Sequence, residues 1–194
     1  MRAAFALLVD HRVHNWMRRL VLELQTKHQI GYLAASLPAH VSLKQPFPVS
    51  DLAGVEGYFD GLARSVEPFP IALTGLGLRI ASMGDEEMGI LWLDVEESQT
   101  LRNLHNRINR ELAERFEDTA APFDGPEYHF HATVAMGERP PAIYRRVYDE
   151  YRHLHVPPAC TAREMVMFYG GNEGGPDRFI TYKILPLGGS GAGA

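Results

Sequence analysis

Two short segments of the chain share a pattern of residue types that can carry out acid–base chemistry. Residues 40–43 read His-Val-Ser-Leu and residues 131–134 read His-Ala-Thr-Val, so each histidine is followed two positions later by a hydroxyl side chain. Because side chains alternate between the faces of a strand, His40 would share a face with Ser42, and His131 with Thr133. Histidine changes its protonation near neutral pH, and a hydroxyl can donate a hydrogen bond to a phosphate oxygen. Two such strands facing one ligand would supply the groups needed to cleave a phosphodiester.

The surroundings of the two segments also repeat, which indicates an internal duplication. The histidines are 91 residues apart in a chain of 194 residues. An apolar stretch followed by an aspartate precedes each segment, namely residues 5–9 with Asp10 and residues 89–93 with Asp94. In each half the predicted order is strand, helix, histidine strand, helix and strand. A repeat of this kind determines the architecture, because each half must build an equivalent part of it.

The elements that must position these segments follow from hydrophobic periodicity. Apolar residues at helical spacing predict helices over residues 11–28, 52–66, 98–116 and 142–154. Ser98 is the expected N-cap of the third helix, and the prolines at 140 and 141 favour the start of the fourth. Turn residues between apolar runs predict hairpins over residues 73–95 and 164–185. Residues 188–194 are glycine, alanine and serine, and we expect a disordered tail there.

The composition is that of a soluble globular protein, with 45% hydrophobic and 22% charged residues. A net charge of −5 argues against broad electrostatic contact with nucleic acid, but it permits recognition of one RNA end through a few phosphates. The single cysteine, Cys160, excludes an internal disulfide. No apolar run approaches the roughly 20 residues that cross a membrane. We therefore expect a cytoplasmic protein without membrane contact.

With these paired motifs half a chain apart, the sequence resembles the two-histidine phosphoesterase superfamily, which includes RNA 2′,3′-cyclic phosphodiesterases and 2′-5′ RNA ligase-like proteins. The resemblance extends from Phe5 to about Leu187, and residues 40–47 are similar to the first motif of small bacterial members. Ser42 occupies a position that is more often threonine, a change that keeps the hydroxyl. The resemblance implies an α+β fold, a bilobal pseudo-symmetric duplication in which two antiparallel sheets line a central cleft with helices on the outside. It also implies one domain over residues 1–187, with repeat halves at about 3–80 and 88–187 that do not separate into linear lobes.

In this interpretation His40 and His131 are the catalytic acid and base, and Ser42 and Thr133 bind the phosphate. Lys44 has the strand parity of His40, and His129 has that of His131, so both are candidate substrate-binding residues. The expected activity is metal-independent hydrolysis of a cyclic 2′,3′- or a 2′-5′ phosphodiester in RNA ends or small nucleotides. No cofactor and no obligatory protein partner are expected. Because the halves are alike, the sequence does not assign which histidine is the acid.

Two alternatives remain open at this point. A non-catalytic protein could use the same cleft to bind an RNA end or a nucleotide without turnover. A metal-dependent hydrolase could use His129 and His131, because His-x-His is a metal-binding spacing, which His153 and His155 repeat. Neither pair has an accompanying cluster of Cys, Asp or Glu. We otherwise expect His153 and His155, and His105 in the third helix, to be solvent-exposed.

Overall fold

Helices and strands follow one another in nearly the predicted order in a computed structural model of the chain, which describes residues 1–83, 86–157, 159–171 and 178–188. The predicted tail falls, except for Gly188, outside the described residues. The helices are α1 (His11–His28), α2 (Tyr32–Ala35), α3 (Leu52–Ser65), α4 (Gln99–Arg115) and α5 (Pro141–Tyr151). The strands are β1 (Arg2–Leu8), β2 (His40–Pro48), β3 (Phe69–Met83), β4 (Glu86–Val95), β5 (His131–Met136), β6 (Ala159–Ala162), β7 (Glu164–Gly171) and β8 (Arg178–Pro186).

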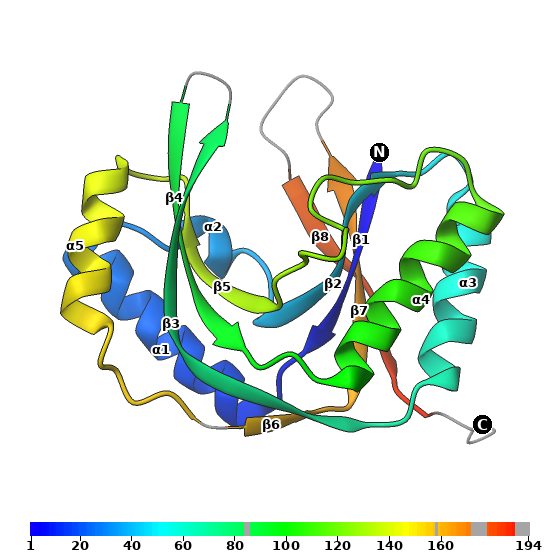
Figure 1. The fold of residues 1–194 in the computed structure, drawn as a ribbon, viewed down its shortest axis with the longest axis horizontal. Coiled ribbons are helices and arrows are strands. Elements are labelled where there is room, and N and C mark those ends of the chain that lie inside the picture. The colour runs from blue at the N-terminus through cyan, green and yellow to red at the C-terminus, as the bar shows by residue number, and fades with distance from the viewer. Residues whose placement is uncertain (84–85, 158, 172–177, 189–194) are drawn as a thin grey trace.

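The strands form two four-stranded antiparallel sheets (Figure 1). The first sheet has the order β2-β1-β7-β8, and the second, strongly curled sheet has the order β5-β4-β3-β6. The strands that begin with the motif histidines, β2 and β5, therefore occupy equivalent places, each at the edge of a sheet. The predicted α+β fold with two antiparallel sheets is confirmed, and each sheet takes strands from both halves of the chain.

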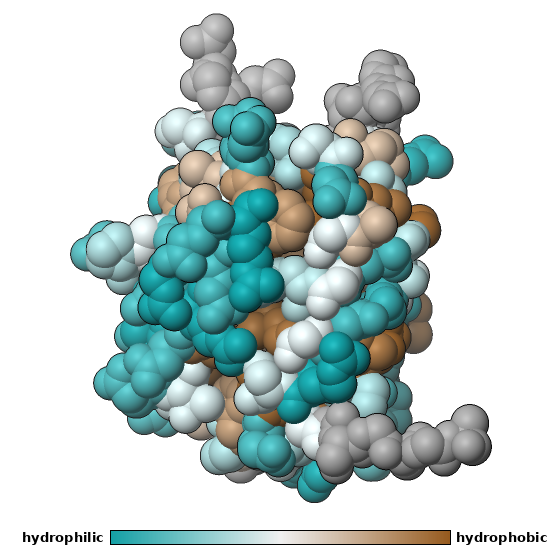
Figure 2. All heavy atoms as spheres, turned by 90° about the vertical axis from the view of Figure 1, so that its right-hand side faces the viewer, coloured by the Kyte–Doolittle hydropathy of each residue, from teal (hydrophilic) through white to brown (hydrophobic). Residues whose placement is uncertain are grey.

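The helices lie on the outside of the two sheets (Figure 1). Helices α3 and α4 contact the first sheet, and α1, α2 and α5 contact the second. The helix after the first strand of each half crosses to the other sheet, since α1 contacts β5 and α4 contacts β2. Figure 2 shows the side of α3 and α4, where hydrophilic side chains surround smaller apolar areas. No helix within the described ranges is long and apolar enough to cross a membrane.

Each sheet has an outer face, which packs against helices, and an inner face on the opposite side. On the outer face of the first sheet, Phe5 packs against Phe59 of α3 with ring centroids 5.1 Å apart. The next residue, Ala6, lies on the inner face in a small apolar cluster with Phe168. On the second sheet the same alternation places Trp92 on the inner face, between leucines that belong to the main core.

Local signals account for where the longer helices begin, whereas the short helix α2 depends on a distant residue. Ser98 Oγ accepts the backbone N–H of the third helical residue of α4 at 3.2 Å, as the sequence predicts for an N-cap. Asp10 and Asp51 cap α1 and α3 in the same way. At the start of α2, backbone N–H groups at Gly31 and residue 33 donate to the carboxylate of Glu138, which follows β5. Nothing near α2 in the sequence indicates this helix.

Candidate active site

The motif histidines lie on the inner faces of the two edge strands, β2 and β5. These strands belong to different sheets but contact each other, and Figure 1 shows them side by side at the centre of the molecule. Ser42 and Thr133 follow His40 and His131 on the same faces, because each is paired with an inner-face residue of the neighbouring strand. Two imidazoles and two hydroxyls thus project from adjacent strands on the inner side of both sheets.

Both imidazoles make the same hydrogen bond through Nδ1. Nδ1 of His40 lies 2.7 Å from the carbonyl oxygen of Pro38, and Nδ1 of His131 lies 2.7 Å from the carbonyl oxygen of His129. A carbonyl oxygen can only accept, so Nδ1 carries a proton in both rings. In each neutral ring Nε2 therefore holds the lone pair and can take a proton, and in the charged ring Nε2 can give one up. The duplication extends to the tautomer of the two histidines.

The surroundings favour the neutral form of both imidazoles. Burial lowers the pKa of His40 below its ordinary value of 6.5, and the charge of His131 lowers it further. Burial is also the largest cause that lowers the pKa of His131. The charges of His129 and Arg79 act in the same direction, whereas the carboxylate of Asp94 raises this pKa. The influence of one histidine on the other places the two rings within electrostatic reach.

A β-bulge sends Lys44 to the outer face of β2, although strand parity predicts the inner face. Residues 6 and 5 of β1 lie opposite Ser42 and Lys44, so Leu43 is an extra residue in β2. One extra residue reverses the alternation of faces beyond it. Lys44 is consequently buried, 1% exposed, and forms an ion pair with Asp124. Its ammonium group points away from the face that carries the motif histidine.

His105 is fully buried, so the expectation that it is solvent-exposed is wrong. It lies one helical turn after Leu101 on the apolar stripe of α4. Its Nδ1 lies 2.8 Å from the carbonyl oxygen of Leu43, the extra residue of the bulge. Because a bulged residue leaves the regular ladder, its carbonyl needs a donor from elsewhere. His105 therefore stabilises the bulge that immediately follows the first motif.

The second motif strand has its bulge at the equivalent residue, Val134, and an aromatic network surrounds its histidine. The indole of Trp92 packs against the imidazole of His131 with ring centroids 4.8 Å apart. Trp92 Nε1 donates to Oδ1 of Asp94 at 2.6 Å, and His129 Nε2 donates to the same oxygen at 2.8 Å. His129 also stacks on His131 at 5.8 Å and an interplanar angle of 17°. One carboxylate thereby fixes two rings that contact the catalytic candidate.

Gly77 of β3 has no side chain, and the indole of Trp92 occupies the space that a side chain would fill. It lies opposite Trp92, and a Cβ at residue 77 would be 2.3 Å from Trp92 Nε1 and 2.9 Å from Oδ2 of Asp94. None of these three residues is among the site residues that the sequence predicts. The available signal was the alternation along β4, in which Trp92 and Asp94 share a face between buried leucines.

The two histidines have different neighbours, although their backbones are equivalent. The ring of His40 contacts Phe168 of β7 with centroids 4.7 Å apart. The residue opposite His40 is Leu8, whereas the residue opposite His131 is Asp94. Only the second histidine therefore has a carboxylate directly across the strand pair.

The strand register of the two motif strands corrects the sequence-based match of Asp10 with Asp94. Leu8, and not Asp10, is the structural equivalent of Asp94. Asp10 is the N-cap of α1, and its equivalent is Ser98, the N-cap of α4. From the residue opposite the motif histidine to the N-cap of the helix, the chain is two residues longer in the second half, so matching the two aspartates misaligns the halves.

The remaining histidines do not gather into a metal-binding group. Nowhere in the described ranges do three or more His, Cys, Asp or Glu side chains lie together in a way that could hold a metal ion. His129 is half exposed and hydrogen-bonded to Asp94, and His153 and His155 are exposed. Cys160 is buried as a free thiol.

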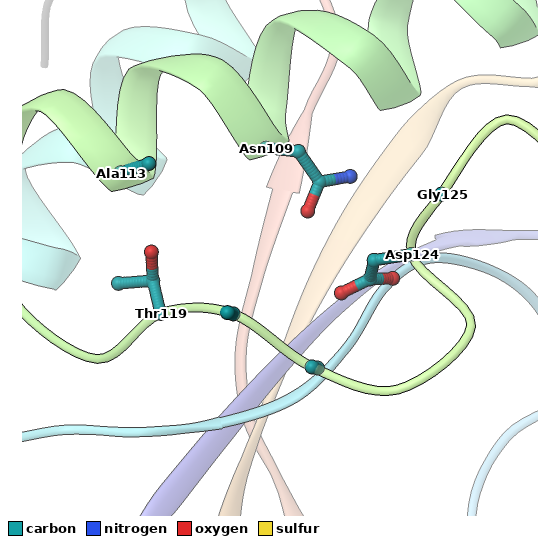
Figure 3. Close-up of a pocket in the computed structure, with 7 residues that line it drawn as sticks. Asn109, Ala113, Thr119, Asp124 and Gly125 are labelled. Atoms are coloured by element: carbon teal, nitrogen blue, oxygen red, sulfur yellow. The ribbon is translucent and has the colours of Figure 1, made fainter.

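A pocket of about 340 Å³ lies between α4 and the loop that follows this helix (Figure 3). Figure 3 shows Asn109 on the helix side and Thr119 and Asp124 on the loop side. The Asn109 amide donates to the carbonyl oxygen of His105 at 3.0 Å, and Asp124 is paired with Lys44. The lining otherwise consists of alanine and glycine and contains none of the four motif residues.

Comparisons with known proteins agree with this fold. The family model described as the 2′-5′ RNA ligase superfamily matches residues 10–173. The chain is similar to E. coli LigT complexed with 3′-AMP, with a TM-score of 0.58 and 18% identity over 96% of this chain and 97% of that chain. The match to E. coli LigT complexed with NADP+ has a TM-score of 0.57 and 17% identity, over 97% of this chain and 98% of that chain. The match to Kluyveromyces marxianus Usb1 has a TM-score of 0.53 and 14% identity, over 96% of this chain and 97% of that chain. The comparison with curated proteins finds no match.

Proposed function

The chain belongs to the 2′-5′ RNA ligase superfamily of two-histidine phosphoesterases, and on this basis we propose that it hydrolyses a cyclic 2′,3′- or a 2′-5′ phosphodiester in RNA ends or small nucleotides. The observation that carries the proposal is the pair His40 and His131. Each ring has its Nδ1 bonded to a backbone carbonyl, and each therefore keeps Nε2 for proton transfer. Such a pair supplies one acid and one base to the same phosphorus.

In the proposed reaction a neutral imidazole takes a proton from a water molecule as the water oxygen bonds to phosphorus. The bond from phosphorus to one ribose oxygen breaks, and the second imidazole, which is protonated, gives its proton to that oxygen. The product from a cyclic substrate is a 2′- or 3′-phosphate monoester. Ser42 and Thr133 donate hydrogen bonds to the non-bridging oxygens, where negative charge increases in the transition state.

The different neighbours of the two rings favour His131 as the proton donor. The carboxylate of Asp94 stabilises the charged form of His131, and among the residues that the structure describes no carboxylate has this effect on His40. A charge on His131 in turn lowers the pKa of His40, because two positive rings repel each other. We therefore assign the proton donor to His131 and the base to His40, because the Asp94 carboxylate favours a charge on His131.

A second candidate function is nucleotide binding without turnover, as the same groups can hold a phosphate. E. coli LigT, which shares this fold, is complexed with the nucleotides 3′-AMP and NADP+ in two of its structures. In that case the hydroxyls and imidazoles would bind the phosphate, and replacing a histidine would change affinity alone.

The two functions are separated by incubating the protein with 2′,3′-cyclic nucleotides, a 2′-5′-linked dinucleotide and RNA that ends in a cyclic phosphate. Chromatography and ³¹P NMR identify any product and the position of its phosphate. Turnover that is absent from a His40→Ala, His131→Ala protein supports the phosphoesterase. Binding of 3′-AMP without turnover of any substrate supports the binding protein. Turnover lost in EDTA and restored by zinc would favour the metal-dependent alternative.

A further inference from the structure

The loop between α4 and β5 contains an exposed phenylalanine in an unfavourable backbone conformation. Phe123 is 67% exposed and has a φ of +69°. The left-handed region is rare for residues with a large side chain, and an exposed ring contributes little to a core. Neither packing nor backbone preference explains a phenylalanine at this position. Unfavourable conformations of this kind persist where the surrounding structure enforces them, and they cluster at ligand-binding sites.

The residues that follow Phe123 fasten this loop to the first sheet. The carboxylate of Asp124 pairs with buried Lys44 and accepts a backbone N–H of β2 at 3.1 Å. Further along the loop, the hydroxyl of Tyr128 donates to the carbonyl oxygen of Ser42 at 3.0 Å. These contacts hold the loop that carries Phe123 along the edge of β2.

Arg79 approaches Phe123 from the second sheet. It has the strand parity of Gly77, which faces Trp92, so it lies on the inner face of β3. Its guanidinium lies over the phenylalanine ring at 5.2 Å from the centroid. Its charge also reaches His131, whose pKa it lowers. The pair of Arg79 and Phe123 therefore lies on the inner side of the second sheet, within electrostatic reach of His131.

We propose that Arg79 and Phe123 form a subsite for a second nucleotide, the one attached to the nucleotide whose phosphodiester is cleaved, so that the preferred substrate is an RNA end of two or more nucleotides. An aromatic ring stacks on any nucleobase, and a guanidinium binds a phosphate through two parallel hydrogen bonds. A single cyclic nucleotide has one phosphate, which the histidines occupy, and leaves the guanidinium without an anionic partner. The inference rests on the proposed function and narrows its substrate class.

The test compares kcat/KM for adenosine 2′,3′-cyclic phosphate with that for the dinucleotide ApA ending in the same cyclic phosphate. The unchanged protein is expected to prefer the dinucleotide. Each protein is assayed at its own pH optimum, because Arg79 lowers the pKa of His131 and its loss moves the pH profile for both substrates. Phe123→Ala and Arg79→Gln should then each reduce kcat/KM for the dinucleotide, relative to that for the mononucleotide, roughly tenfold, the scale of one lost stacking contact.

Three further variants separate loss of contact from loss of structure. Phe123→Gly removes the ring, but glycine adopts a positive φ without strain, so its Tm should not fall below that of the unchanged protein. Its dinucleotide preference should still be lost. Leu22→Ala and Arg110→Gln remove an exposed apolar side chain from α1 and an exposed guanidinium from α4. These two control variants should leave kcat/KM unchanged for both substrates.

If the Phe123→Ala and Arg79→Gln variants lost kcat/KM equally on both substrates, or on neither, the proposed subsite would be overturned. The same holds if the unchanged protein shows no preference for the dinucleotide. If the unchanged protein cleaves neither substrate, the proposed function fails, and the subsite is then decided by calorimetric binding of the products. ApA 3′-phosphate should bind roughly tenfold more tightly than 3′-AMP, with the difference abolished by Phe123→Gly. Equal binding of the two products would reject the inference.

Discussion

Asp94 lies directly opposite His131 in the pairing of β4 with β5, and the same carboxylate accepts a hydrogen bond from the indole that packs against that histidine. The equivalent position opposite His40 is Leu8. The duplicated backbone thus gives both histidines the same tautomer, while the side chains around them give the two rings different electrostatic surroundings.

Asp94→Asn is expected to move one limb of the pH–rate profile to lower pH. The carboxylate raises the pKa of His131, so its loss lowers that pKa, whereas the residue opposite His40 is the apolar Leu8. If His131 is the acid, the basic limb moves, since the protonated form is then lost at a lower pH. Turnover at the optimum should fall roughly tenfold, the scale for a residue that orients another. A profile identical to that of the unchanged protein would show that Asp94 has no such role.

His40→Ala and His131→Ala should each reduce kcat by roughly a hundredfold or more, because each removes one partner in proton transfer. His153→Ala is the matched control, because His153 is exposed at the end of α5 and should be dispensable. Circular dichroism checks that all three variants are folded. Near-normal turnover in either motif variant would contradict paired-histidine catalysis.

The profile of kcat/KM against pH should be bell-shaped with its maximum below pH 6.5. Both imidazoles have a pKa below the ordinary value of 6.5 in the free protein. The acidic limb reflects protonation of the base and the basic limb reflects loss of the proton from the acid, so the maximum lies between two lowered values. A bound anionic substrate raises the pKa of both imidazoles, so the maximum of kcat should lie at a higher pH. A maximum of kcat/KM above about pH 7 would contradict this assignment.

Gly77→Ala should lower the free energy of unfolding by about 1–3 kcal/mol, the usual cost of overpacking, and should reduce turnover. The added Cβ would lie 2.3 Å from Trp92 Nε1, which forces the indole away from His131. Gly75→Ala is the control on the same face of the same strand, because a Cβ there has no atom within 4 Å. Urea unfolding and steady-state kinetics distinguish the two, and equal behaviour would show that the indole adjusts freely.

Lys44→Met should lower the free energy of unfolding by about 3–5 kcal/mol, because it leaves the carboxylate of Asp124 buried without its partner. A second change, Asp124→Leu, should recover part of that loss. The KM of the folded variant for a cyclic mononucleotide should change little, since the ammonium lies on the outer face. Normal stability with an increased KM would instead restore Lys44 as a substrate-binding residue.

Much of the fold is predictable because its signals are local. The apolar stripe of α1 and the N-cap at Ser98 define helix positions from residues within a few turns, and the structure places both helices within one residue of the prediction. The repeated histidine pattern is also local, as it needs only two residues on one strand. The duplication and the family resemblance follow from these signals, and the resemblance implies the α+β class.

The surroundings of the site depend on contacts between segments that are distant in the sequence. Strand parity predicts one face for Lys44, but a bulge, stabilised by His105 from α4, reverses it. The short helix α2 exists because Glu138, more than 100 residues later, accepts its first N–H groups.

The sequence by itself determined which residues are the candidates for acid–base chemistry and which elements hold them, since both depend on spacing along one segment. Tertiary structure alone decided that Asp94 lies opposite one histidine and Leu8 opposite the other, and that Phe123 meets Arg79. These pairings are set by strand register and by a loop attached to another sheet. The groups that form these pairings are distant in the sequence and come together only in the folded chain, so no local sequence pattern encodes them.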